Sequence, residues 1–298
     1  MSNPLIDFSK GLTSAVETGG ASTILVDARK RYPASGIAYS EDHVLTADHV
    51  VSRDDNIKVM LPDGKSLDAT LAGRDPGSDL ALLRISDKAL TPAKTSDDVK
   101  VGQFVLALGR PNSDGVQASW GIVTSIHGPA RTHRGGMLDE YIRSEATPYP
   151  GFSGGPLINA EGEVLGLNTS GLGRGSSVTI PVKVAWRIAE SLSKHGSVKR
   201  GYLGVRTQPV EISEASRKAL NREQKVGLLV LWVEENGPAQ AGGVFVGDTI
   251  VSVGDKPVND PDGLFSVLHS DTVGKSVEVE VLRGGKPETL QVTVGERK

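Results

Sequence analysis

The sequence contains no cysteine among its 298 residues. Disulfide bonds, thiol nucleophiles and cysteine-ligated metal sites are therefore excluded. Aromatic residues make up only 4% of the chain, whereas 36 residues are glycine, a balance that favours strands and turns over helices. Long hydrophobic runs are also lacking, since no stretch reaches the roughly 18 consecutive apolar residues that a membrane-spanning helix needs.

The chain has no strong excess of charge of either sign. Lysine and arginine total 33 and aspartate and glutamate total 36, for a formal net charge of −3. The charges are mixed along the chain without a basic block, so we expect neither a nucleic-acid partner nor a membrane-surface partner. Residues 1–5 lack the basic start and apolar core of a signal peptide. We therefore expect either a cytoplasmic protein or a chain from which an export signal or anchor has been removed.

The hydrophobic pattern of the first 181 residues begins as a helical pattern and then becomes a pattern of short strands. Residues 4–17 carry apolar residues at helical spacing and predict a short amphipathic helix within an N-terminal segment, 1–21. Short β-rich runs separated by turn signals follow as far as residue 181, as expected for an all-β barrel or a pair of barrels. The expected strands are 23–26, 57–61, 67–71, 80–85, 104–108, 121–126, 141–143 and 164–168.

A second amphipathic helix is predicted over residues 182–194, where Gly196 suits a left-handed C-terminal cap. It closes a domain expected at 22–196. Residues 197–298 then have the size of a small second domain. Its expected strands are 203–207, 228–233, 249–253, 276–282 and 289–294, and its expected helices are 213–221 and 261–269.

One segment, PYPGFSGGPL at 148–157, gathers three glycines and three prolines around Ser153. Such a segment is either an ordinary tight turn or a loop that exposes a serine for nucleophilic attack. A serine nucleophile needs a histidine as general base and a carboxylate that orients the histidine. Of the six histidines, His49 lies at the end of an apolar run, and Asp79 lies in a turn that leads into an expected strand.

Together these segments resemble the HtrA/DegP family of serine proteases. The motifs that carry the resemblance are Thr46-Ala-x-His49-Val, Asp75-Pro-x-x-Asp79-Leu-Ala-Leu-Leu and Gly151-x-Ser153-Gly-Gly-Pro-Leu, in the order His, Asp, Ser. The resemblance continues through residues 198–205 and through the glycine-rich pattern of residues 237–253. It implies a mainly β protein, with a chymotrypsin-like double β-barrel followed by one PDZ domain.

The Gly-x-Ser-x-Gly core of residues 151–155 also fits the nucleophile elbow of an α/β-hydrolase. That elbow requires a strand–turn–helix context and the chain order Ser, Asp, His. Here Gly-Gly-Pro follows Ser153, and no alternation of strands and helices precedes it. We therefore reject the α/β-hydrolase alternative.

The resemblance implies a serine endopeptidase in which Ser153 is the nucleophile, His49 the general base and acid, and Asp79 the residue that orients His49. The backbone N–H groups of Gly151 and Ser153 would form the oxyanion hole. No cofactor and no metal ion are expected, because these residues fill the chemical roles. Activity should fall at low pH, since a protonated imidazole cannot accept the serine proton.

One residue departs from the family pattern, because Phe152 stands where the family usually carries asparagine. We expect its ring to pack against an apolar wall and to bias the loop rather than block it. By the resemblance, residues 169–179 occupy the place of the specificity-pocket loop. Residues 127–137 fit either a mobile sensor loop or an ordinary surface hairpin.

The resemblance also implies partners. Unfolded or misfolded polypeptides would be the substrates, in protein quality control, and a homotrimer is expected with Phe8 in the contact. The backbone of Tyr202, Leu203, Gly204 and Val205 would hold the terminal carboxylate of a peptide that adds to a sheet edge; the alternative is an empty site on a tether. Family members often act outside the cytoplasm. The competing function is a catalytically impaired PDZ scaffold or chaperone on a protease fold.

Overall fold

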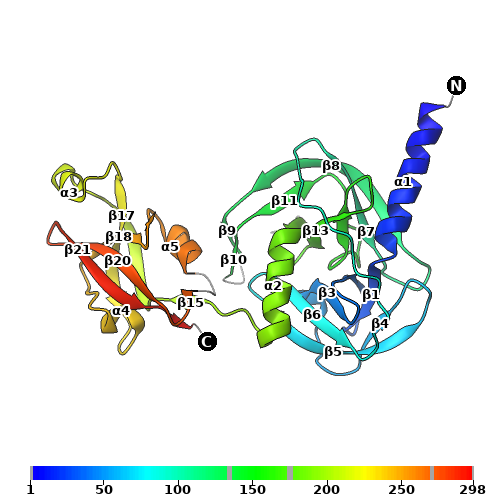
Figure 1. Cartoon of the computed structure of the whole chain (residues 1–298), viewed down its shortest axis with the longest axis horizontal. Helices are drawn as coiled ribbons and strands as arrows, with labels where there is room; N and C mark the ends of the chain where they lie inside the picture. The colour runs from blue at the N-terminus through cyan, green and yellow to red at the C-terminus, as the bar shows by residue number, and fades with distance from the viewer. Residues whose placement is uncertain (1–2, 133–135, 173–176, 269–271, 297–298) are drawn as a thin grey trace. The chain divides into compact units, whose positions relative to one another are not determined.

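The computed structural model describes residues 3–132, 136–172, 177–268 and 272–296 (Figure 1). The chain divides into two compact units, Met1–Val198 (unit 1) and Lys199–Lys298 (unit 2). No helix in the described part is both long and apolar enough to cross a membrane.

Unit 1 consists of an N-terminal helix, two closed β-barrels of six strands each, and a second helix. The strand order is β1-β2-β3-β6-β5-β4 in the first barrel and β11-β14-β13-β12-β7-β8 in the second. The expected pair of barrels is therefore confirmed. The bounds are α1 (Pro4–Gly20), β1 (Thr23–Asp27), β2 (Ala34–Ala38), β3 (His43–Ala47), η1 (Asp48–Val50), β4 (Ile57–Met60), β5 (Ser66–Asp75), β6 (Leu80–Ile85), β7 (Phe104–Gly109), β8 (Gln117–His127), β9 (Ala130–Arg131), β10 (Met137–Leu138), β11 (Tyr141–Ser144), β12 (Pro156–Ile158), β13 (Val164–Thr169), β14 (Val178–Pro181) and α2 (Val182–His195).

Helix α1 extends further than its periodicity predicts, to Gly20. At its start, the Asn3 side chain accepts a hydrogen bond from the Leu5 N–H, as an N-cap does. At its end, the buried Arg110 guanidinium donates to the carbonyls of Gly20 and Thr23. Burial lowers the pKa of Arg110. The last turn is thus stabilised by a residue far along the chain, which local periodicity does not reveal.

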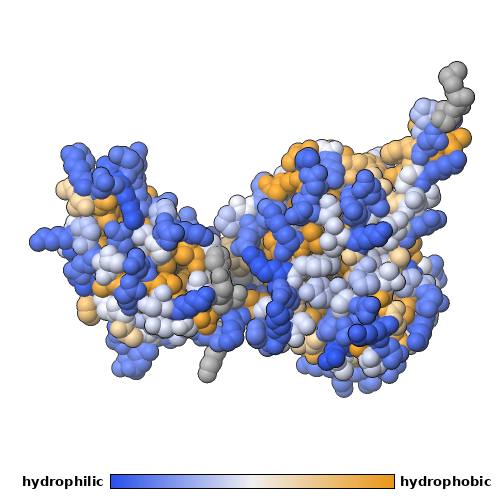
Figure 2. Space-filling view, in the orientation of Figure 1, coloured by the Kyte–Doolittle hydropathy of each residue, from blue (hydrophilic) through white to orange (hydrophobic). Residues whose placement is uncertain are grey.

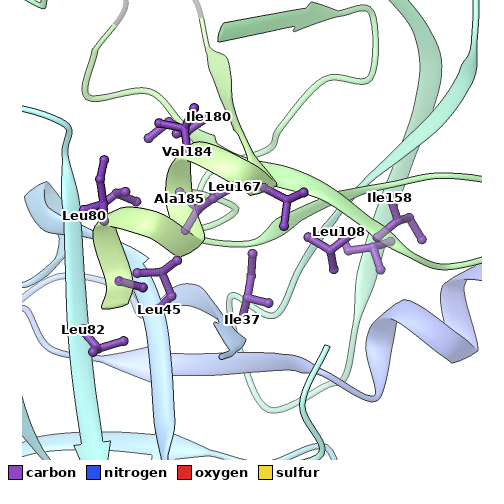
Figure 3. Close-up of a cluster of buried hydrophobic side chains, with 14 of the residues drawn as sticks. Ile37, Leu45, Leu80, Leu82, Leu108, Ile158, Leu167, Ile180, Val184 and Ala185 are labelled. Carbon is purple, nitrogen blue, oxygen red and sulfur yellow. The ribbon is translucent and has the colours of Figure 1, made fainter. Parts of the chain in front are cut away.

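Helix α2 confirms the predicted helix, and Gly196 ends it with φ of 72° and an N–H bond to the Leu192 carbonyl. Its apolar face joins a buried cluster to which both barrels contribute (Figure 3). The labelled side chains are Ile37, Leu45, Leu80 and Leu82 from the first barrel, Leu108, Ile158, Leu167 and Ile180 from the second, and Val184 and Ala185 from α2. Each fully buried aliphatic side chain contributes roughly 1.5–3 kcal/mol, so this cluster fixes one barrel against the other.

Four strands of the two barrels were not predicted: β2, β3, β12 and β14. Nearly all of their residues are buried, so they lack the apolar–polar alternation that marks a half-exposed strand. Within the expected loop 127–137, the described residues form the short β9–β10 pair, and residues 133–135 lie outside the described part. Residues 173–176 of the segment 169–179 also lie outside it.

Unit 2 is built on a sheet of order β16-β17-β18-β20-β21, in which β19 pairs with β18 and β15 pairs separately with β22. The expected strand at 203–207 is wrong at its start, because Leu203 and Gly204 separate β15 from β16 and Gly204 has φ of 77°. The expected helix end at residue 269 lies outside the described residues. The bounds are β15 (Gly201–Tyr202), β16 (Val205–Glu211), α3 (Glu214–Leu220), β17 (Val226–Val233), α4 (Pro238–Ala241), β18 (Thr249–Val253), β19 (Lys256–Pro257), α5 (Pro261–Val267), β20 (Ser276–Arg283), β21 (Lys286–Thr293) and β22 (Gly295–Glu296).

Candidate active site

His49 and Asp79 are brought together by the pairing of β3 with β6. Ala47 lies opposite Leu80 in this register, so the single turn η1 after β3 meets the residue that precedes β6. His49 Nδ1 lies 2.8 Å from Asp79 Oδ2, and the His49 backbone N–H donates to Asp79 Oδ1 over 2.9 Å. Asp79 is fully buried. A carboxylate at Nδ1 favours the tautomer that carries its proton there, which leaves Nε2 as the proton acceptor.

Thr169, at the end of β13 in the second barrel, completes the surroundings of Asp79. Its hydroxyl donates to Asp79 Oδ2 and accepts a hydrogen bond from the Gly171 N–H over 2.9 Å. A Cβ at Gly171 would collide with Asp79 Oδ2 and His49 Nδ1. From the sequence, Thr169 was expected only as part of the loop 169–179 and not as a partner of Asp79. The one feature that could have indicated it is a hydroxyl residue directly after the expected strand 164–168.

Ser153 lies in a loop held against the first barrel. The Ser35 hydroxyl donates to the Gly151 carbonyl over 2.7 Å, and the Ser35 N–H donates to the Ser153 carbonyl over 3.2 Å. A Cβ at Gly154 would collide with the Ser35 carbonyl oxygen and Thr46 Oγ1. The glycine therefore lets the loop approach β2 and β3 closely.

The two backbone N–H groups expected to form the oxyanion hole make no hydrogen bond in the described structure. Gly151 adopts φ of 90°, a conformation that suits glycine. Within the described part of the chain, neither the Gly151 N–H nor the Ser153 N–H donates a hydrogen bond to a protein acceptor. Both donors therefore remain available to a ligand oxygen.

The Ser153 hydroxyl is bonded to a residue that the sequence did not indicate. Ser153 Oγ lies 3.1 Å from Ser170 Oγ. Among the described residues, His49 and Ser153 share no hydrogen bond. The structure thus joins His49 to Asp79 directly, and holds the third expected residue through Ser170.

Phe152 packs as expected against an apolar wall. Its side chain is fully buried in a cluster of eight residues inside the second barrel. The ring also meets Tyr149 edge-on, with centroids 5.5 Å apart. The backbone on each side forms turns, since the Phe152 N–H donates to the Tyr149 carbonyl and the Gly155 N–H to the Phe152 carbonyl.

The expected peptide-binding residues of unit 2 lie around the start of β16, an edge strand of its sheet. Tyr202 belongs to β15, Val205 begins β16, and Leu203 and Gly204 connect them. The Leu203 and Gly204 carbonyls accept from the Ala239 and Glu234 N–H groups, both over 2.8 Å. The N–H groups of Leu203 and Gly204 have no acceptor in the described structure.

In the described ranges, no group of three or more histidine or acidic residues is placed to hold a metal ion.

Comparison with protein-family models shows which class of protein this chain resembles. Residues 34–167 match a trypsin-like peptidase domain and residues 201–294 match a PDZ domain. The first match spans His49, Asp79 and Ser153, and the second spans the start of β16.

Curated proteins with similar sequences are described as DegP-like serine endoproteases. A probable periplasmic serine endoprotease, DegP-like, of Ectopseudomonas mendocina is 38% identical over 269 residues, covering 88% of this chain and 56% of the relative. A protein of the same description from Halomonas elongata is 37% identical over 276 residues, covering 90% and 57%. The chain thus spans little more than half the length of these curated relatives.

Solved structures match over nearly the whole chain. The HtrA-type protease AlgW with tripeptide has a TM-score of 0.80 and 30% identity, covering 96% of this chain and 97% of that one. A serine endoprotease from Yersinia pestis has a TM-score of 0.77 and 28% identity, covering 96% and 98%. The chain belongs to the HtrA/DegP family of serine proteases.

Proposed function

We propose that this chain is a serine endopeptidase, with residues 22–196 as the protease domain after an N-terminal segment 1–21, and residues 197–298 as the PDZ domain. The hydrogen bond between His49 Nδ1 and Asp79 Oδ2 carries the proposal. It leaves Nε2 of His49 as the base that a serine nucleophile needs.

In the proposed mechanism, Ser153 Oγ bonds to the scissile carbonyl carbon while its proton passes to His49 Nε2. His49 then gives that proton to the leaving amine as the C–N bond breaks. Asp79 stabilises the charged imidazole. Water then attacks the acyl carbon while one of its protons passes to His49, and His49 gives that proton to Ser153 Oγ as the bond from the acyl carbon to Oγ breaks. The open N–H groups of Gly151 and Ser153 would bind the oxyanion, where loss of one donor typically costs about 10²–10³ in kcat.

The test is digestion of an unfolded protein such as casein by the wild type and by Ser153→Ala. Cleavage by the wild type that Ser153→Ala abolishes supports the protease. Equal inactivity of both proteins, also with peptides that occupy the PDZ domain, supports the catalytically impaired scaffold instead.

We further propose that the substrates are unfolded or misfolded polypeptides, and that the protein acts in quality control outside the cytoplasm. The descriptions of the curated relatives as periplasmic endoproteases support the compartment. Digestion of one protein in its folded form and in an unfolded form tests the substrate class. Mass-spectrometric mapping of the cleavage sites then gives the preference on the acyl side.

The PDZ domain is proposed to bind peptide C-termini at Tyr202, Leu203, Gly204 and Val205. The open N–H groups of Leu203 and Gly204 would hold the carboxylate, while the peptide pairs as a strand with the free edge of β16. Titration of the chain with one peptide, carrying either a free or an amidated C-terminus, tests this. Equal affinities would mean that the carboxylate is not recognised, and no binding of either would favour a tether.

We propose that the chain forms a homotrimer through its protease domains. Leu5, Ile6 and Phe8 of α1 are more than half exposed, and so is Trp120 on β8. In Figure 2, hydrophobic residues are visible on the projecting part of α1. The rings of Phe8 and Trp120 both contact Phe104, which links them into one apolar surface. Sedimentation equilibrium of the wild type and of Phe8→Ser tests the trimer and this contact; a monomeric wild type would rule out the trimer.

A further inference from the structure

The last residue of β13, Thr169, and the two residues that follow it contact all three proposed catalytic residues. The Thr169 hydroxyl donates to Asp79. The Ser170 hydroxyl is bonded to the Ser153 hydroxyl. The backbone of Gly171 lies so close to His49 and Asp79 that no Cβ fits between them. Ser170 therefore lies between Thr169 and Gly171, and both of these residues are held in place by their contacts with the His49–Asp79 pair.

The other partner in this contact is fixed as well. The Gly154 N–H donates to the Asn168 carbonyl and the Asn168 N–H donates to the Gly155 carbonyl, each over 2.8 Å. These two bonds extend the pairing of β12 with β13 into the nucleophile loop. They place Ser153 beside Ser170 by backbone geometry, although the Ser170 side chain itself is exposed.

The contact has a consequence for the nucleophile. A serine hydroxyl has one proton to donate. Either hydroxyl can be the donor in the Ser153–Ser170 contact. When Ser153 donates to Ser170, its proton is turned away from His49, with which Ser153 shares no hydrogen bond in the described structure. General-base catalysis requires that the Ser153 proton be within hydrogen-bond reach of His49 Nε2.

We propose that Ser170 is a positioning residue that holds the Ser153 hydroxyl in a resting direction. On this proposal, which rests on the proposed protease function, the Ser153 hydroxyl turns from Ser170 to His49 before attack. The proton of Ser153 passes to His49 Nε2 as the bond from Oγ to the carbonyl carbon forms. Ser170 neither receives nor supplies a proton in that step.

Removal of the Ser170 hydroxyl should therefore make Ser153 more reactive. A single neutral hydrogen bond at an exposed site predicts a gain of about 2- to 5-fold. The first readout is the rate constant for labelling of Ser153 by diisopropyl fluorophosphate, a probe too small to report on peptide binding. The second is peptide hydrolysis, in which kcat should rise while KM changes little.

The variants are Ser170→Ala and Ser170→Thr, with Ser276→Ala as the matched control. Ser170→Thr keeps the hydroxyl and should retain the wild-type rates. Ser276 is an exposed serine of unit 2 whose hydroxyl donates to the Gln291 side chain over 3.1 Å, so its removal tests the loss of a similar bond elsewhere. Faster labelling of Ser170→Ala alone supports the proposal.

Two other outcomes overturn it. Unchanged or slower labelling of Ser170→Ala, with a reactive wild type, would mean that the contact is incidental or that it assists attack, and the protease assignment would stand. A wild type that the probe never labels, under conditions where its far-UV circular dichroism shows a folded chain, would overturn the protease function together with this proposal.

Discussion

The ring of Phe152 occupies the space that a side chain at position 109 would need. A Cβ built on Gly109, the last residue of β7, would collide with three atoms of the Phe152 ring. Gly109 has no positive φ, so its backbone conformation accepts alanine, and the three atoms nearest to the added Cβ all belong to the ring. The nucleophile loop is thus anchored inside the second barrel by an aromatic residue and a matching glycine.

This pairing predicts a coupled effect of two substitutions. Gly109→Ala alone should displace the Phe152 ring and lower both stability and kcat/KM, by about 1–3 kcal/mol in stability as overpacking does. Phe152→Leu replaces the ring by a smaller side chain and provides space for the alanine methyl group. In the Phe152→Leu protein, Gly109→Ala should therefore lower stability and kcat/KM by less than it does in the wild type. Urea unfolding and kcat/KM of the four proteins give the coupling. Additive effects would show that the ring and the glycine do not constrain each other.

Phe152→Asn tests whether the anchor biases the loop. We expect a lower kcat and a stronger dependence on PDZ-binding peptides, because an amide cannot replace the buried ring. Val105→Ala is the control, since Val105 is buried in the same cluster but lies on β7. It should lower stability without changing activator dependence. Identical turnover and identical activator dependence of Phe152→Asn and the wild type would refute the bias.

The motifs around His49, Asp79 and Ser153 could be predicted from sequence because each is short and local. The contacts of Thr169 and Gly171 with Asp79 and His49 could not, since they depend on how the second barrel packs against the first. The contact of Ser170 with Ser153 depends on the pairing of β12 with β13. The barrels themselves were predicted only in part. The barrel strands β2 and β12 are short and fully buried, so they lack the alternation that marks a strand. In unit 2, outside the barrels, the turn at Gly204 shifted the expected start of β16.

Thr169→Val should lower kcat by about 10- to 100-fold. The substitution keeps the shape but removes the hydroxyl that donates to buried Asp79, and hydrogen bonds to charged groups contribute about 1.5–3 kcal/mol. KM should change little if Thr169 only orients the His49–Asp79 pair. Steady-state kinetics measure the split, and Thr169→Ser should recover most of kcat. A loss confined to KM would assign Thr169 to substrate binding instead.

Gly171→Ala should reduce kcat by about 10²-fold or more, because displacement of a reacting group by about 1 Å has such effects. The added Cβ would have to displace His49 or Asp79. Gly11→Ala is the matched control: Gly11 lies in α1 with nothing within 4 Å of an added Cβ. That change should leave kcat unaltered and stabilise the helix by about 0.5–1 kcal/mol. Wild-type activity in Gly171→Ala would show that the segment can shift away from His49.

In unit 2, Asp248 predicts a stability that depends on pH. Burial acts to raise the pKa of Asp248, but hydrogen bonds from the Arg283 guanidinium and the Phe245 N–H outweigh it and hold that pKa below its usual value. The folded state therefore favours the charged form. Its contribution is fully present above the carboxyl pKa of the unfolded chain, about 3.9, and is lost as pH falls through the lower folded value.

Asp248→Asn should accordingly destabilise unit 2 by about 1–3 kcal/mol at neutral pH, since Arg283 and the Phe245 N–H lose a charged acceptor. The difference from the wild type should shrink below about pH 4, where Asp248 in the unfolded chain becomes protonated. This difference in the free energy of unfolding is measured by urea unfolding of the full chain at several pH values. Mass spectrometry of pulse-deuterated peptides from unit 2 follows the unfolding of that unit. A difference that is constant from neutral pH to about pH 3 would mean that the charge of Asp248 does not stabilise the folded state.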